Sequence, residues 1–171
     1  RAAAPSGRWL ARAVAGALLG GEPVLMKSAL EDGELTVPAI RADRIPSASP
    51  TVAWQDGTVS GEVPCVLAAG DAVRFVVPVR TAAGAAGLAV VDRDAAGVQV
   101  RPRSLLDQSR SAADVGFTDT PARLLQADDA AASCRRAGDR AAVLIAADAL
   151  GAAERMLEMT VDYAKQRKQF G

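Results

Sequence analysis

Hydrophobic residues near the start of the chain recur at helical spacing. Leu10, Val14 and Leu18 stand at four-residue steps, and a glycine pair follows at positions 20 and 21. A four-residue apolar period is typical of one face of a helix, and glycine favours the end of a helix. The pattern therefore predicts a short helix over residues 7–19.

The pattern changes between residues 23 and 125, where proline, glycine and polar residues separate short runs rich in valine. β-Branched residues favour strands, and the dipeptide Asp56-Gly57 is a strong signal for a two-residue hairpin turn. The predicted strands are residues 51–54, 58–60, 73–79, 87–91 and 98–100. Short strands separated by polar turns predict an antiparallel β-barrel or sandwich.

A long helical pattern without proline begins near residue 128 and continues to the end of the chain. Its apolar residues recur at three- and four-residue steps, which places them on one broad face. That face comprises Ile145, Ala149, Ala152, Met156, Met159 and Tyr163, with an adjacent row of Leu150, Ala153, Leu157, Val161 and Ala164. One helix cannot bury such a face against itself, so we expect it to be exposed unless other helices or another subunit cover it. The sequence thus predicts an α+β chain.

Composition narrows the possible chemistry. The 171 residues are half hydrophobic and include twenty basic residues, twenty acidic residues, two cysteines and no histidine. The absence of histidine excludes Ser-His-Asp catalysis, Cys-His catalysis and His-ligated zinc. Zero net charge and 4% aromatic residues argue against a nucleic-acid partner. No apolar run is long enough to span a membrane, and the two separated cysteines favour a reduced, cytoplasmic setting.

Few residues suggest catalysis on their own. Glu31 and Asp32 could form a pair of carboxylates, although adjacent acidic residues beside a glycine are more often solvated. Cys65 follows a proline in an apolar run, where a buried inert thiol is more frequent than a nucleophile. The glycines near residue 20 do not form a dinucleotide-binding loop, since no strand precedes them.

The most specific motif lies in the last nine residues. Arg167 stands three residues before Phe170-Gly171 and four residues after Tyr163 on the predicted helix, and this arrangement resembles the acyl-CoA dehydrogenase family. The segments similar to the family, in the same order along the chain, are residues 56–61, 75–80, 106–110 and 146–155. The alternative is an ordinary helix end, with basic residues near the dipole and a glycine stop.

The resemblance implies domain boundaries. Residues 1–22 would end an N-terminal helical domain, residues 23–126 would form a middle β-domain, and residues 127–171 would form the first long helix of a C-terminal helical bundle. In the family the β-domain is followed by several helices. The resemblance therefore implies that the chain is a fragment of a longer protein.

The resemblance also implies a reaction. Members of the family bind FAD between the β-domain and the C-terminal helices, and they oxidise an acyl-CoA thioester to the 2,3-enoyl product with a carboxylate as base. The implied partners are the acyl-CoA substrate, an electron-transfer flavoprotein or similar acceptor, and further subunits in a homo- or hetero-oligomer. This chemistry requires no histidine, so the composition agrees with it.

Site residues follow from their matching positions. Arg167 matches the arginine that reaches the FAD pyrophosphate of a neighbouring subunit, and Gln169 and Phe170 match positions that line the same cofactor. Leu67 stands where the family usually has a threonine whose hydroxyl meets the flavin ring. Cys65 stands where a tryptophan commonly flanks that ring.

Two further positions depart from the family. Leu30 aligns with a second threonine at the flavin edge, and Ala141 aligns with the catalytic glutamate that a minority of members place early in the long helix. The base is expected beyond Gly171, so no catalytic residue is assigned. The departures leave two functions open: an FAD-dependent acyl-CoA dehydrogenase, or a cofactor-poor, non-catalytic partner subunit of a heteromeric one. A non-enzymatic binding domain is a third alternative.

Overall fold

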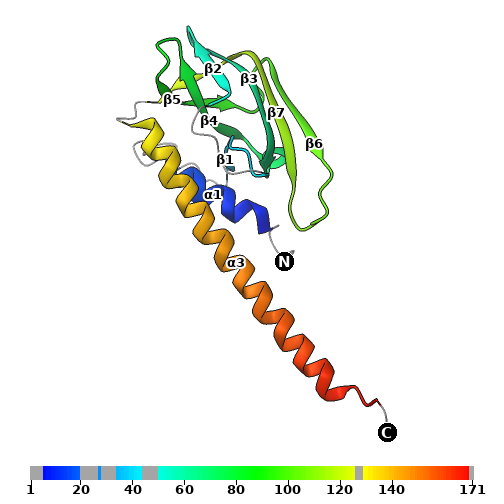
Figure 1. Ribbon diagram of the computed structural model, residues 1–171. Coiled ribbons are helices and arrows are strands. Elements are labelled where there is room, and N and C mark those ends of the chain that lie inside the picture. The colour runs from blue at the N-terminus through cyan, green and yellow to red at the C-terminus, as the bar shows by residue number, and fades with distance from the viewer. Residues whose placement is uncertain (1–5, 20–26, 28–33, 44–49, 126–128, 170–171) are drawn as a thin grey trace.

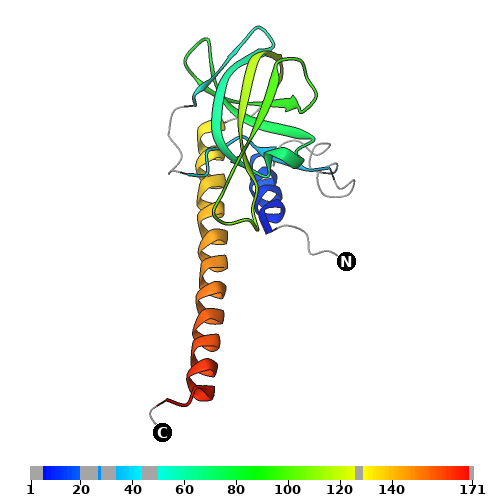
Figure 2. The ribbon, with the colours of Figure 1, turned by 90° about the vertical axis from the view of Figure 1, so that its right-hand side faces the viewer.

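The computed structural model describes residues 6–19, 27, 34–43, 50–125 and 129–169. A curled β-sheet forms one body, a short helix packs against it, and a long helix runs past both and projects away (Figures 1 and 2). The elements are α1 (Ser6–Leu18), β1 (Thr36–Pro38), β2 (Val52–Gln55), β3 (Thr58–Leu67), η1 (Ala69–Asp71), β4 (Arg74–Thr81), β5 (Ala86–Asp92), β6 (Val98–Arg103), β7 (Ala112–Pro121), β8 (Arg123–Leu124) and α3 (Ala130–Gln166).

The predicted N-terminal helix is confirmed as α1. Leu10, Val14 and Leu18 are all buried, as their four-residue spacing requires for one inward face. They belong to a cluster that also includes Val76 and Leu88 of the sheet. The helix therefore covers one side of the β-domain.

The predicted strands are present, and the sheet is mixed rather than wholly antiparallel. Its order is β6-β7-β3-β2-β4-β5-β8, with β1 beside β4. The β2–β3 hairpin turns at Asp56 and Gly57, which both have positive φ, as the dipeptide predicted. Strands β1 and β2 run parallel to β4. The local pattern could not show this, because each parallel pair joins strands that are far apart in sequence.

The sequence pattern did not predict strand β7. This segment contains two alanines, one glycine and two aspartates, all of which are poor strand formers. In the fold, β7 pairs along its length with β3 on one side and with β6 on the other. Tertiary pairing on both edges therefore outweighs the weak local preference.

The core of the β-domain is built mainly from small branched side chains. The rings of Phe75 and Phe117 meet edge to face, with centroids 6.2 Å apart and planes at 81°. The fully buried valines around them include Val37, Val52, Val59, Val66, Val77, Val79, Val91 and Val115. The β-domain thus has a buried core of its own within the chain.

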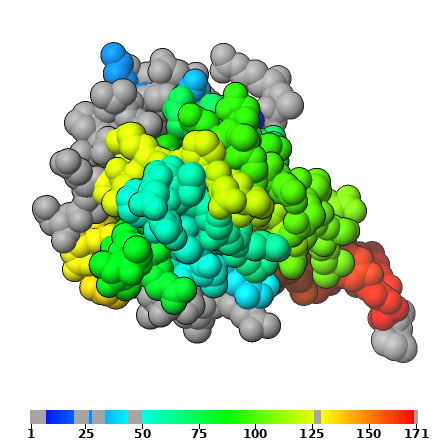
Figure 3. Space-filling model, turned by 90° about the horizontal axis from the view of Figure 1, so that it is seen from above, coloured from blue at the N-terminus to red at the C-terminus, as the bar shows by residue number. Residues whose placement is uncertain are grey.

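Helix α3 begins at an N-cap and then leaves the β-domain. The Asp129 carboxylate accepts from the Ala132 N–H at 2.8 Å, which satisfies a donor of the first turn. Only Ala130 and Ala137 of the helix are buried. The Arg110 guanidinium contacts the Asp148 carboxylate and ties the loop before β7 to the middle of the helix. The helix projects away from the sheet (Figures 1 and 2), and its C-terminal end stands out from the rest of the molecule when seen from above (Figure 3).

The apolar face predicted on α3 is exposed along its C-terminal half. The exposed large residues of this face are Ile145, Leu150, Met156, Leu157, Met159, Val161 and Tyr163, and Val143 on the same helix is exposed as well. This agrees with the expectation that such a face needs a cover from outside these residues. None of the described helices combines the length and the apolar composition that a membrane crossing requires.

Candidate functional site

The residues assigned from the sequence lie in two separate places. Cys65 and Leu67 belong to β3 in the sheet, whereas Arg167 and Gln169 follow the far end of α3. Figure 1 shows how far this end of the helix lies from the sheet. Phe170, together with Leu30, Glu31 and Asp32, lies outside the described residues. One copy of the chain therefore does not bring the two groups together.

Cys65 occupies an irregular point in the sheet. The register between β3 and β7 shifts between Val63 and Val66, so Cys65 lies in a bulge with φ of 52°. A positive φ is uncommon for a residue with a side chain and requires support from its surroundings. The residue is only 7% exposed. Its thiol thus contributes little to the surface.

Asp114 of β7 supports this bulge. Its carboxylate accepts from the Cys65 backbone N–H at 2.8 Å and pairs with Arg103 Nε at 2.7 Å. The Cys65 N–H first, and the Arg103 guanidinium second, hold the pKa of the Asp114 carboxyl below its ordinary value. The backbone donor of Cys65 is therefore engaged within the protein.

The segment after β1 lies against the same bulge. The Ala42 N–H donates to the Cys65 carbonyl at 3.0 Å. On either side of Ala42, the Arg41 guanidinium and the Asp43 carboxylate form a two-pronged pair. Hydrogen bonding from Arg41 holds the pKa of the Asp43 carboxyl below its ordinary value. The sequence pattern did not indicate these residues, because they meet Cys65 only through a contact between segments that are far apart in sequence.

Leu67 brings an aliphatic side chain to the end of β3. It is half-buried and packs against the cluster that contains α1 and β5 residues. The next residue, Ala68, donates its N–H to the Ser111 carbonyl at 2.8 Å. A flavin ring offers polar edge atoms that require hydrogen-bond partners. This end of β3 supplies a leucine, an inward thiol and two engaged N–H groups, so it fits a flavin ring poorly.

A pH experiment tests the role of Asp114. Its lowered pKa means that the carboxylate stabilises the fold above the unfolded value of about 4, and that this stabilisation disappears as the pH falls through the lower folded value. We expect Asp114→Asn to be less stable than the parent near neutral pH, and the difference to shrink below pH of about 4. Urea unfolding of both proteins from pH 7 to pH 3 measures the difference in their free energies of unfolding. Asp139→Asn, on an exposed turn of α3, is the control, and an equal difference at every pH contradicts the prediction.

The end of α3 presents a guanidinium that its neighbours hold. Arg167 caps the helix, with its N–H donating to the Tyr163 carbonyl at 2.9 Å. Its Nη1 donates to the Tyr163 hydroxyl at 2.8 Å. With its amide oxygen toward the guanidinium, Gln169 accepts from Nη2 at 2.5 Å and from Nε at 3.2 Å. All three side chains are exposed, so the cluster can meet an anion from solvent or from another subunit.

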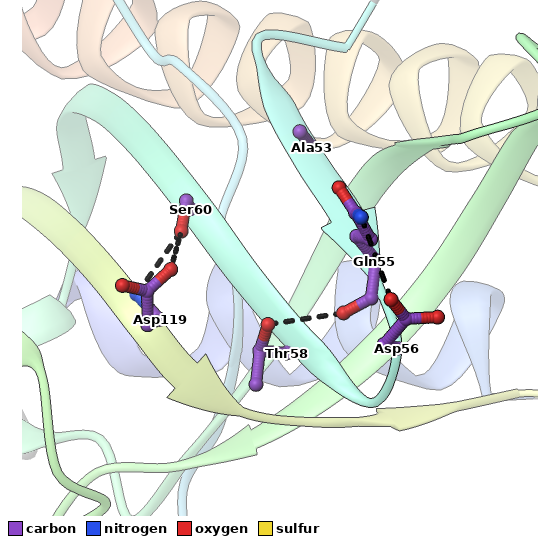
Figure 4. Close-up of a pocket in the computed structure, with 6 residues that line it drawn as sticks. All are labelled: Ala53, Gln55, Asp56, Thr58, Ser60 and Asp119. Carbon is purple, nitrogen blue, oxygen red and sulfur yellow. Dashed lines mark hydrogen bonds between the residues drawn. The ribbon is translucent and has the colours of Figure 1, made fainter.

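A hollow beside the β2–β3 hairpin is a different feature. It is lined by Ala53, Gln55, Asp56, Thr58, Ser60 and Asp119 (Figure 4). Ser60 donates to the Asp119 carboxylate and accepts from its N–H, both at 3.0 Å. Thr58 donates to the Gln55 carbonyl at 3.0 Å. These polar groups bond to one another, and none of the residues assigned from the sequence lines the hollow.

Ala141 lies in apolar surroundings on α3. It is half-buried and packs, like Leu144, against the cluster formed with α1 and β5. Its methyl group cannot accept a proton. The described residues also contain no group of three or more carboxylates or cysteines that could hold a metal ion.

Part of the chain is similar in sequence to a curated protein. No protein-family model matches the chain. The curated acyl-CoA dehydrogenase IpdE2 of Mycobacterium tuberculosis is 48% identical over 65 residues, which are 36% of this chain and 20% of that protein.

Solved structures match almost the whole chain. Butyryl-CoA dehydrogenase from Megasphaera elsdenii has a TM-score of 0.81 and 17% identity, over 96% of this chain and 49% of that one. A variant of the Tcur3481-Tcur3483 steroid ACAD has a TM-score of 0.76 and 26% identity, over 92% of this chain and 45% of that one. The ChsE4-ChsE5 complex from Mycobacterium tuberculosis has a TM-score of 0.71 and 22% identity, over 95% of this chain and 46% of the matched chain. The chain thus spans less than half the length of these relatives.

Proposed function

The chain is a relative of the acyl-CoA dehydrogenases, and from this premise we propose that it is part of an FAD-dependent enzyme that oxidises an acyl-CoA thioester to the 2,3-enoyl-CoA. In this proposal, residues 23–126 are the middle β-domain, residues 1–22 end the preceding helical domain, and residues 127–171 begin the C-terminal helical domain. An electron-transfer flavoprotein or a similar acceptor takes up the electrons.

The observation that carries the proposal is the Arg167 cluster at the end of α3. Its guanidinium is exposed and held by Tyr163 and Gln169. Planar, paired donors suit a phosphate group, so Arg167 would hold the FAD pyrophosphate. Oxidation of the Cα–Cβ bond is the chemistry that FAD supplies when bound. Arg167 caps the C-terminal end of α3, which lies far from the sheet that contains strand β3 (Figure 1). The flavin that Arg167 contacts would therefore belong to another subunit.

A second candidate is a cofactor-poor partner subunit that lends Arg167 to the flavin of a catalytic chain. The Cys65 bulge favours it. Leu67 has no hydroxyl, and the Cys65 N–H, which could replace one, donates to Asp114 instead. Ala141 lacks the carboxylate of an early catalytic glutamate. Among the proteins that share this fold, ChsE4-ChsE5 is a complex.

Flavin counting tests both candidates. The protein is purified in its native assembly, reconstituted with FAD, and its flavin absorbance is divided by the number of copies of this chain. The first candidate predicts one flavin per copy and acyl-CoA-dependent reduction of an electron acceptor. The second predicts a flavin only when a catalytic partner chain is present. An assembly with no flavin absorbance and no acyl-CoA-dependent reduction contradicts both.

A further inference from the structure

Tyr163 and Arg167 form a unit at the last turn of α3. The two residues are four positions apart, so their side chains lie on the same face of the helix. Besides the 2.8 Å hydrogen bond from Nη1 to the hydroxyl, Arg167 Cζ lies 5.6 Å from the centroid of the Tyr163 ring. This distance is within the range of a cation–π contact. One aromatic side chain thus contacts the guanidinium in two ways.

The contacts of the Arg167 guanidinium within the chain leave two of its N–H groups for a ligand. A guanidinium carries five N–H groups, one on Nε and two on each terminal nitrogen. The Tyr163 hydroxyl accepts a hydrogen bond from one N–H of Nη1. The Gln169 amide oxygen accepts one hydrogen bond from Nη2 and one from Nε. One N–H remains on each terminal nitrogen. Two donors on neighbouring nitrogens can bind two oxygens of one phosphate or carboxylate.

We propose that Tyr163 is a positioning residue that holds the Arg167 guanidinium ready to bind a phosphate group, here the pyrophosphate of FAD. The inference rests on the proposed function and adds to it a role for Tyr163. Tyr163 is 58% exposed, so its ring is not fixed by burial in a core. An arginine side chain has many rotamers in solution, and fixing them before the ligand arrives reduces the entropic cost of binding.

The test compares two substitutions that each remove one hydroxyl from the same helix. Tyr163→Phe keeps the ring and removes the acceptor. Thr160→Val is the matched control, because the Thr160 hydroxyl donates to the Met156 carbonyl at 2.7 Å and is not bonded to Arg167. We expect Tyr163→Phe to raise the Kd for FAD, measured by titrating the native assembly, about three- to tenfold. Thr160→Val should leave that Kd unchanged.

Inorganic pyrophosphate and a double substitution separate positioning from a general loss of structure. If Tyr163 acts through Arg167, Tyr163→Phe should weaken competition by pyrophosphate to a similar extent as it weakens FAD binding. In an Arg167→Ala background, Tyr163→Phe should have no further effect. The inference is wrong if the effect persists in that background, or if Arg167→Ala weakens binding and Tyr163→Phe does not. If neither substitution changes the Kd, the proposed role of Arg167 also fails.

Discussion

Replacing Arg167 with alanine is expected to raise the Kd of the native assembly for FAD about 10- to 100-fold. Hydrogen bonds to charged groups contribute about 1.5–3 kcal/mol, and a paired donor set on one phosphate lies in this range. The loss should be larger than that of Tyr163→Phe, because alanine removes the ligand-binding group as well as its support. Equilibrium titration followed by flavin fluorescence measures the change.

Arg155→Ala is the matched control for this prediction. Arg155 is an exposed arginine on the same helix, and its Nη1 lies 3.1 Å from the Glu158 carboxylate. Exposed ion pairs of this kind contribute little to stability, so the control should change neither folding nor FAD affinity. Equal losses of affinity in the two variants would point to net charge on the helix rather than to a site. No loss with Arg167→Ala would contradict the assignment of Arg167 to the cofactor.

Replacing Gly97 with alanine is expected to destabilise the β-domain by about 4 kcal/mol or more. Gly97 lies between β5 and β6 with φ of 85°, where a side chain costs about 1–2 kcal/mol in any surroundings. In addition, an added Cβ would stand 2.1 Å from the Thr118 carbonyl oxygen and 2.7 Å from the Thr120 hydroxyl. Thr120 is fully buried, and the Thr118 carbonyl belongs to the backbone of strand β7, so neither neighbour has much room to move. The free energy of unfolding in urea measures the loss.

Gly84→Ala separates backbone strain from the clash. Gly84 has a similar φ of 78°, but an added Cβ there meets nothing within 4 Å. We expect this variant to lose only about 1–2 kcal/mol, which is the cost of a positive φ for a residue with a side chain. If the two variants lose the same free energy, the tight packing at Gly97 does not contribute, and the prediction is wrong.

The β-domain and the second half of α3 differ in whether their apolar residues are buried. The β-domain buries its own core around Phe75 and Phe117, whereas the second half of α3 exposes an apolar face. The Arg167 cluster lies at the end of that exposed half. A surface that covers α3 would therefore also come close to Arg167. This agrees with a proposed flavin contact made between subunits.

Local patterns alone determined much of the fold. The spacing of Leu10, Val14 and Leu18 predicted α1 and its buried face, and Asp56-Gly57 predicted a hairpin that the structure contains. The long helix and the exposure of its apolar face followed from periodicity and from the lack of a covering element. These features depend on residues within a few turns of one another, so the sequence displays them directly.

Tertiary structure decided the rest. Strand β7 forms despite its alanines and aspartates, because β3 and β6 pair with both of its edges. The sequence identified Cys65 and Leu67 only by position, and nothing in it indicated that Asp114 engages the Cys65 N–H from 49 residues away. Such contacts form between segments that meet only after folding, and no local period records them. The residues of the candidate site could therefore be named from the sequence, whereas the hydrogen bonds that limit or prepare them for a ligand could not.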